Sequence, residues 1–280
     1  MARLLVFLSF FLLAVGACHA ALPADLYWNV VFPSTPMPSA IRDVLRPDVI
    51  ANEKNAAAEP QVQDDPAAAL FFIEKDLRPG ARMTLHFTRT TSAANFLPRK
   101  AADSIPFSSA KLPAVLARLS IDPNSEKAQA MKKTLQECEE QAIDGETKRC
   151  ATSLESMVEF STSSLGTQDV RALSTTVEKK STPKQQYTIA SVQKVAGPTL
   201  VACHAESYAY AVFLCHTTDA RAYTVSMVGK DGTKVEAVAA CHADAAALSP
   251  KAFEVLKVKP GTVPVCHFLP QNDLVWGPNK

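Results

Sequence analysis

The chain has 280 residues, with 29 basic and 28 acidic side chains and a formal net charge of +1 at pH 7. Because Lys and Arg are dispersed and balanced by acids, the sequence lacks the basic footprint of nucleic-acid-binding proteins. The length after the first twenty residues suffices for one large or two small domains. We therefore expect a globular protein, monomeric and without a nucleic-acid partner.

Residues 1–20 predict a cleaved signal peptide. Arg3 precedes an apolar run from Leu4 to Val15, and small residues follow up to Ala20, the preferred cleavage site. This run is too short to span a bilayer, so we expect export without a membrane anchor.

Residues 21–69 predict a short leader or linker. Its front carries Tyr27, Trp28 and Phe32 before a proline-spaced run, and its back, residues 52–69, is alanine-rich and acidic. Such a composition buries too little apolar surface to offset backbone ordering. We expect a poorly ordered arm, with Tyr27 and Trp28 anchoring it onto a domain that spans residues 70–280.

Three helices are predicted in the first part of that domain. Apolar residues recur at helical spacing over residues 112–119. A second helix is expected to begin with Asp122 as N-cap and to stop at Gly145. A third is expected between a capping box at residues 152–155 and Gly166.

Six cysteines remain after the signal peptide, and an even number in an exported chain argues for disulfides. They are Cys138, Cys150, Cys203, Cys215, Cys241 and Cys266. Six cysteines allow fifteen pairings, which the sequence does not decide. One is favoured: Cys138 on the second helix and Cys150 before the third would staple a helical hairpin across a short loop.

After residue 169 the sequence becomes rich in β-forming residues, and Asp231-Gly232 predicts a hairpin turn. The predicted strands cover residues 187–189, 200–202, 208–214, 222–228, 235–239 and 263–268. The expected fold class is α+β, with a helical subdomain and its stapled hairpin packed on antiparallel β-sheets.

A Cys-His dipeptide occurs four times in this strand-rich part. The pairs are Cys203-His204, Cys215-His216, Cys241-His242 and Cys266-His267. Neighbouring side chains on a strand point to opposite faces, so each cysteine can face the core while its histidine faces a cleft. A disulfide sulfur is no thiolate ligand, so a metal site here would rest on nitrogen. Nitrogen ligands suit Cu(II) first and Zn(II) next.

Two alternatives to an all-histidine metal site stay open. The cysteines can be purely structural, with the histidines satisfied by backbone hydrogen bonds. The pairs can also form Cys/His zinc sites, which export disfavours. His86 stands apart, in an alternating segment that predicts a sheet face, and is a minor candidate for a fifth ligand.

Taken together, these motifs resemble those of BURP-domain proteins, a family of exported plant proteins. The family pattern has two phenylalanines that open the domain, two further cysteines and four Cys-His pairs. Phe71-Phe72, Cys138, Cys150, the four pairs and Trp276 match it, over residues 70 to 278.

The resemblance implies copper ligation by His204, His216, His242 and His267. It also implies a secreted protein of the apoplast or cell wall, or alternatively the vacuole, with a stress- or development-related role and cell-wall components as partners. Some members are copper-dependent peptide cyclases that crosslink Tyr or Trp side chains, in their own leader or in a separate peptide. This leader has no repeats and no Gln-started motif ending in Tyr or Trp. Catalytic residues are not identified, and enzyme activity stays open.

Overall fold

The computed structural model describes residues 23–45, 71–87, 94–179, 183–244, 248 and 250–279. The predicted signal peptide, residues 1–20, and the back of the predicted leader, residues 46–69, lie outside the described residues.

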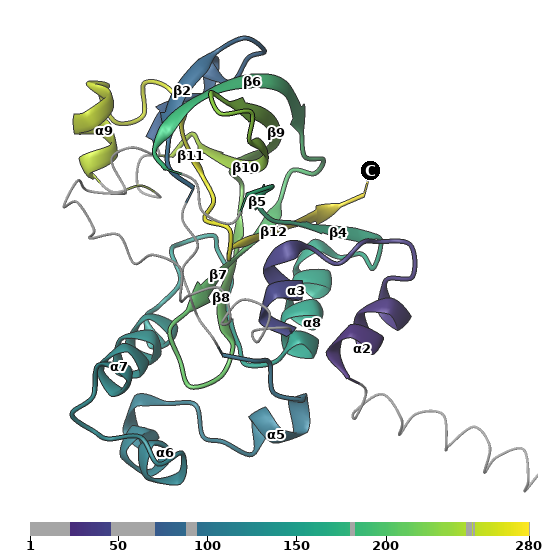
Figure 1. Ribbon diagram of the computed structural model, residues 1–280. Helices are drawn as coiled ribbons and strands as arrows, with labels where there is room; N and C mark the ends of the chain where they lie inside the picture. Colours follow the sequence, from purple (N-terminus) through teal and green to yellow (C-terminus); the bar gives the residue numbers. More distant parts are fainter. Residues whose placement is uncertain are drawn as a thin grey trace, which may run out of the picture.

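Two antiparallel sheets dominate the described part of the chain (Figure 1). The first, here called sheet A, has the order β1-β11-β10-β9-β6-β2, and β5 also pairs with β10. Its strands are β1 (Phe71–Ile73), β2 (Arg82–Leu85), β5 (Thr176–Val177), β6 (Gln185–Lys194), β9 (Arg221–Gly229), β10 (Lys234–His242) and β11 (Val265–Phe268). The second, sheet B, has the order β3-β8-β7-β12-β4. Its strands are β3 (Lys148–Ala151), β4 (Val170–Leu173), β7 (Leu200–Glu206), β8 (Val212–Thr218) and β12 (Leu274–Pro278).

Helices lie mainly on the sheet B side of the molecule (Figure 1). The α-helices of the described residues are α2 (Ala24–Val31), α3 (Ser39–Leu45), α5 (Arg99–Asp103), α6 (Leu112–Arg118), α7 (Glu126–Glu139), α8 (Leu154–Leu165) and α9 (Pro250–Leu256). Two short 3-10 helices, η2 (Glu74–Asp76) and η3 (Ser109–Lys111), join strands and helices. The α+β fold class is thus confirmed.

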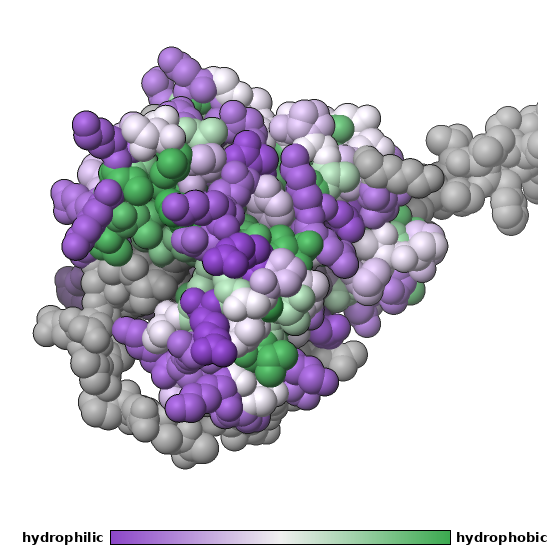
Figure 2. Space-filling model, turned by 90° about the horizontal axis from the view of Figure 1, so that it is seen from above, coloured by the Kyte–Doolittle hydropathy of each residue, from purple (hydrophilic) through white to green (hydrophobic). Residues whose placement is uncertain are grey.

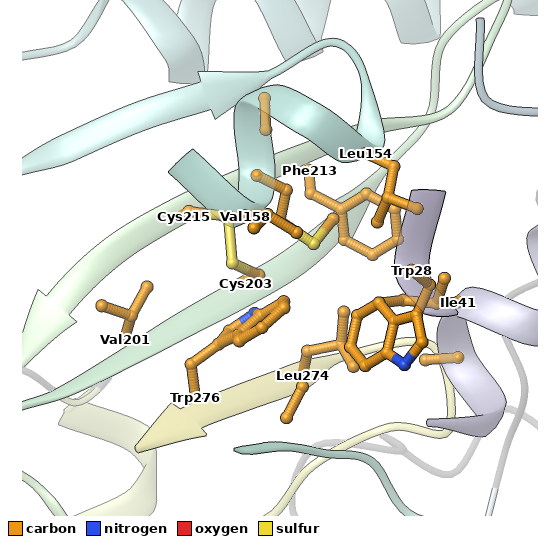
Figure 3. Packing of buried hydrophobic residues seen from close by; sticks show 14 of the residues in the cluster. Trp28, Ile41, Leu154, Val158, Val201, Cys203, Phe213, Cys215, Leu274 and Trp276 are labelled. Carbon is orange, nitrogen blue, oxygen red and sulfur yellow. A yellow bond between two sulfur atoms is a disulfide. The ribbon is translucent and has the colours of Figure 1, made fainter. Parts of the chain in front are cut away.

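Strand alternation gives each sheet two faces with different neighbours. Val201, Cys203 and Trp276 of sheet B pack in one core with residues of α2, α3 and α8 (Figure 3). On sheet A, Val235, Ala237 and Ala239 belong to a second core with aromatic residues from the same curled sheet. The remaining faces meet each other: Leu200 and Val275 of sheet B pack with Val238 and Ala240 of sheet A. The inner layer between the two sheets is therefore built from small and aliphatic side chains.

The front of the predicted leader is folded, which corrects the expectation of a poorly ordered arm for residues 23–45. Trp28 of α2 is fully buried, with its ring centroid 4.9 Å from that of Phe32 and 5.7 Å from that of Trp276. Its indole Nε1–H donates to the backbone oxygen of Thr35 at 2.9 Å. The predicted anchoring by Trp28 is confirmed. Concentrated aromatic area lets a segment with little periodicity order itself, which average composition does not reveal.

The second predicted helix is shorter than expected at both ends. Asp122 instead caps a turn, where its Oδ1 accepts from the N–H of Asn124 at 2.9 Å. Ser125 is the N-cap of α7, accepting from the N–H of Ala128 at 3.1 Å. The helix ends at Glu139 rather than Gly145. The third helix, α8, ends at Gly166 as predicted, but its capping box pairs Ser153 with Ser156 rather than using residues 152 and 155.

The predicted Cys138–Cys150 disulfide is present, with a Cα–Cα distance of 5.7 Å. Cys150 precedes α8 as expected, but it lies in β3 and pairs with Leu214 of β8. The disulfide therefore ties the end of α7 to the edge strand of sheet B, and the predicted helical hairpin is wrong. It brackets the loop of residues 140–147 that leads from α7 into the sheet.

Most predicted strands are found, and the Asp231-Gly232 turn joins β9 to β10 as expected, with a φ of +83° at Gly232. The strand predicted over residues 208–214 begins only at Val212. Tyr208 and Tyr210 precede it in a bend and pack in a separate core with residues of α6 and α7. Their β-forming character reflects burial in that core, not strand pairing.

Candidate metal site

Each sheet carries one disulfide between directly opposed residues of neighbouring strands. In sheet B, Cys203 of β7 faces Cys215 of β8 in the register and is bonded to it. In sheet A, Cys241 of β10 faces Cys266 of β11 and is bonded to it. All four residues are at most 1% exposed and point into the two outer cores. Their sulfurs are therefore unable to act as thiolate ligands in this state.

The histidine that follows each cysteine points to the opposite face, into the layer between the sheets. Because the cysteines are opposed, the two histidines of each sheet stand diagonally across neighbouring strands. The Nε2 atoms of His204 and His216 are 3.4 Å apart, and so are those of His242 and His267. Ring centroids lie 5.5 Å apart in both pairs, with near-parallel planes. The same local geometry thus arises twice.

Both pairs line one cavity of about 220 Å³ between the sheets. Its walls are mostly small and aliphatic, with Ile143 and Glu146 of the loop between α7 and β3 at its edge. The lining residues are Ile143, Glu146, Leu200, Ala202, His204, His216, Thr218, Ala220, Ala222, Ala240, His242, His267, Leu269 and Val275. The four imidazoles share a cavity but remain two separate pairs. Within the part of the chain that the structure describes, no three His, Cys, Asp or Glu side chains group closely enough to hold a metal ion.

His204 is the histidine with a strong carboxylate partner. Its Nδ1 lies 2.7 Å from Oδ2 of Asp273, whose other oxygen accepts from the N–H of Ala205 at 3.1 Å. Burial lowers the pKa of His204, but the hydrogen bond and the charge of Asp273 outweigh it, so the pKa is raised above its ordinary value. A carboxylate only accepts, so in the neutral ring the proton lies on Nδ1 and the Nε2 lone pair faces His216.

The other three histidines are held in the neutral form. Burial and the neighbouring His204 lower the pKa of His216, although Glu146 lies 3.3 Å from its Nδ1. Burial, with a contribution from His267, lowers the pKa of His242 to about 4. Burial also lowers the pKa of His267. Neutral imidazole is the form that binds metal ions.

His86 lies outside this cavity. It follows β2, and its side chain is exposed while those of Leu85 and Phe87 are buried in the outer core of sheet A. Because β2 ends at Leu85, His86 lies just past the strand rather than on the sheet face, and it does not line the cavity.

Sequence reasoning did not find Asp273, Glu146 or the part played by Phe71, which pairs with His267 across β1 and β11. None of them belongs to the repeated dipeptide. Asp273 precedes Leu274, which faces Cys203 across β12 and β7, and only this register brings the carboxylate to His204.

Within each pair, the spacing of the two imidazoles matches that of two ligands of one metal ion. Two imidazole nitrogens bound at about 2.0–2.1 Å to one ion in near-tetrahedral geometry lie about 3.3 Å apart, close to the 3.4 Å within each pair. In three of the four rings Nδ1 faces a backbone or carboxylate oxygen. Their Nε2 lone pairs are therefore directed toward the neighbouring ring, an arrangement that a cation between the rings would stabilise.

Comparison with known proteins places the chain in a family. The sequence model of the BURP domain matches residues 70–278. The chain is 60% identical to "BURP domain-containing protein 3" of Oryza sativa subsp. japonica over 79% of its length, which covers 53% of that relative. It is 49% identical to "BURP domain-containing protein 2" of the same plant, over 99% of both chains. It is also 49% identical to "BURP domain protein RD22" of Arabidopsis thaliana, over 79% of this chain and 58% of that protein.

Two further properties accompany this likeness. Three disulfides are typical of proteins from oxidising compartments. None of the helices within the described ranges has the length and apolar character needed to cross a membrane. With the two phenylalanines of β1, the six bonded cysteines and the four cavity histidines in place, the chain belongs to the BURP-domain family.

Proposed function

We propose that the protein binds copper in the cavity between its two sheets, through His204, His216, His242 and His267. The observation that carries the proposal is the pairing of Nε2 atoms at 3.4 Å in both sheets, within one cavity. All-nitrogen ligation suits Cu(II), with Zn(II) second. Cross-strand disulfides on the opposite faces hold each pair in register, so the ligands are largely preorganised.

The wider role that we propose is that of a secreted protein of the apoplast or cell wall, linked to stress or development. The disulfides and the family membership support export. Residues 1–20, which would direct it, are not among the described residues. Cell-wall components are the proposed partners.

Self-modification as a peptide cyclase has less support. The aromatic residues of the predicted leader are Tyr27, Trp28 and Phe32, and all three pack in the core on the outer face of sheet B. In β12, Trp276 faces this core while its neighbour Val275 lines the histidine cavity. Sheet B therefore stands between the leader's aromatic rings and the cavity. A cyclase of this architecture would have to act on a separate peptide.

The test is Cu(II) titration of the metal-free full chain by calorimetry and electron paramagnetic resonance. We expect stoichiometric binding in the parent protein and its loss when His204 and His242 are both replaced by alanine, since one ligand of each pair disappears. His86→Ala, at an exposed histidine outside the cavity, is the matched control and should bind as the parent does. Retention of full copper binding by the double variant would contradict the proposal.

Intact mass after exposure to copper and oxygen separates binding from self-modification. An unchanged mass is expected, because Tyr27 and Trp28 lie on the far face of sheet B. Loss of two hydrogens within residues 21–69 would instead establish a cyclase that acts on its own leader.

A further inference from the structure

The two histidine pairs differ in the strand that flanks them. Strand β12 runs next to β7, which carries His204. Leu274 of β12 pairs with Cys203 of β7, and Asp273 immediately precedes Leu274. Next to β11, which carries His267, runs β1, and the residue opposed to His267 is Phe71, with ring centroids 6.1 Å apart. The flanking strand thus presents a carboxylate to one pair and a phenyl ring to the other.

Asp273 is held firmly in place. Its residue is 8% exposed, and its backbone N–H donates to the oxygen of Pro270 at 3.1 Å. Its Oδ1 accepts from the N–H of Ala205, next to His204, which leaves Oδ2 directed at the imidazole. A carboxylate with both oxygens engaged fixes the orientation and tautomer of a ring far better than solvent does.

The Nδ1 atom of the partner ring, His216, also faces oxygen atoms, but its contact with a carboxylate is longer than that of His204. Its Nδ1 lies 3.1 Å from the backbone oxygen of Thr217 and 3.3 Å from Oε2 of Glu146. Its contact with the carboxylate is longer and shared with the carbonyl. In sheet A, the partner of the His267 Nδ1 among the described residues is the backbone oxygen of Phe268, at 3.4 Å.

We propose that Asp273 is a positioning residue that fixes the Nδ1–H tautomer of His204, directs its Nε2 into the cavity, and makes His204–His216 the stronger half of the metal site. This inference rests on the proposed copper binding. The sheet B pair would hold the ion more firmly, and the neutral sheet A pair would supply the remaining nitrogen ligands. Removal of the carboxylate weakens the site although Asp273 itself touches no metal.

Asp273→Asn tests this in the full chain: the amide keeps the shape, but with its oxygen held by the N–H of Ala205 it turns an NH2 donor toward Nδ1 of His204, which disfavours the Nδ1–H tautomer. We expect Cu(II) affinity to fall about 10–100-fold, the range found for partners of metal-binding histidines. Glu146→Gln should reduce the affinity less, given its longer, shared contact. Asp169→Asn removes an exposed carboxylate that accepts from Asn279 and should leave the affinity unchanged. Parent-like affinity in Asp273→Asn would overturn the proposal.

A second measurement separates failure of this inference from failure of copper binding itself. Nitrogen-15 NMR of the metal-free protein, recorded above the pKa of His204 so that the ring is neutral, reports the tautomer of each histidine directly. The proposal requires His204 to carry its proton on Nδ1 in the parent protein and to lose that preference in Asp273→Ala. An Nε2–H tautomer in the parent, or an unchanged tautomer in Asp273→Ala, would refute the positioning role whether or not copper binds.

Discussion

Sheets A and B contain the same unit in different surroundings. Each has an opposed cysteine pair bonded across two strands, and each places two histidines diagonally on the reverse face with Nε2 atoms 3.4 Å apart. The outer face of sheet B is covered by helices, including two from the N-terminal segment, whereas sheet A curls around its own core. The flanking residue is Asp273 in one sheet and Phe71 in the other.

The difference shows what a short motif controls. Strand alternation makes the Cys-His dipeptide produce the same pair geometry in both sheets. The protonation of the rings depends on their surroundings, because Asp273 raises the pKa of His204 whereas burial lowers that of His242. The dipeptide and strand alternation determine the spacing of the paired histidines, whereas the surrounding tertiary structure determines their pKa values.

The largest expected effect concerns the cover of sheet B. Trp28→Ala should lower the free energy of unfolding by about 3–5 kcal/mol, because it removes a fully buried ring that packs on Phe32 and Trp276. Denaturant unfolding measures the loss. Leu26→Ala, on the same helix but 46% exposed, should change stability by less than about 0.5 kcal/mol. Equal effects of the two substitutions would mean that α2 is not part of the core.

The disulfides give the next effect and compare the sheets directly. Replacing Cys203 and Cys215 by alanine should cost about 3 kcal/mol, and replacing Cys241 and Cys266 about 0.6 kcal/mol more. The second bridge closes the longer loop, with a sequence separation of 25 against 12. Replacing Cys138 and Cys150 provides the control, since that separation is also 12 but the cysteines are only partly buried. A larger loss for the sheet B bridge would show that loop entropy does not dominate.

The smallest effect is the pH response of the two pairs in metal-free protein. His242 has a folded pKa of about 4, below its ordinary value, so the unfolded chain takes up the proton first as the pH falls. Stability is therefore lost between about pH 6.5 and pH 4. His204, with a raised pKa, contributes stability below about pH 6.5 that is lost as the pH rises through its folded pKa.

NMR titration of the imidazole signals checks both directions. His204 should titrate above the ordinary histidine range and His242 well below it. His242→Ala should reduce the loss of stability on acidification over the same window. If both rings titrated together, the carboxylate and burial effects assigned to the two sheets would be wrong.

The sequence predicted the repeated unit better than its surroundings. Alternation on strands was enough to place the cysteines in the cores and His204, His216, His242 and His267 on the opposite faces. The pairing of strands was not readable, because it depends on contacts between residues far apart in the chain. For the same reason Asp273 and Glu146 carried no signal, and Cys150 was assigned to a helix boundary instead of strand β3.

The helix boundaries show a different limit. Asp122 and Ser125 are both good N-cap residues, and the choice between them depended on where α7 meets its core rather than on intrinsic preference. The N-terminal segment was misjudged because composition averages over length. Three aromatic residues in α2 and just after it supply the buried area that the average conceals.

The chain's two tryptophans, Trp28 and Trp276, lie in the same core with ring centroids 5.7 Å apart. Tryptophan fluorescence thus reports on the half of the molecule built on sheet B and its helices. Because Trp276 is adjacent to Val275 at the cavity wall, an ion that quenches emission should dim this signal from across a single strand. Tryptophan emission would therefore detect such an ion in the cavity, and local opening of sheet A alone would leave the emission unchanged.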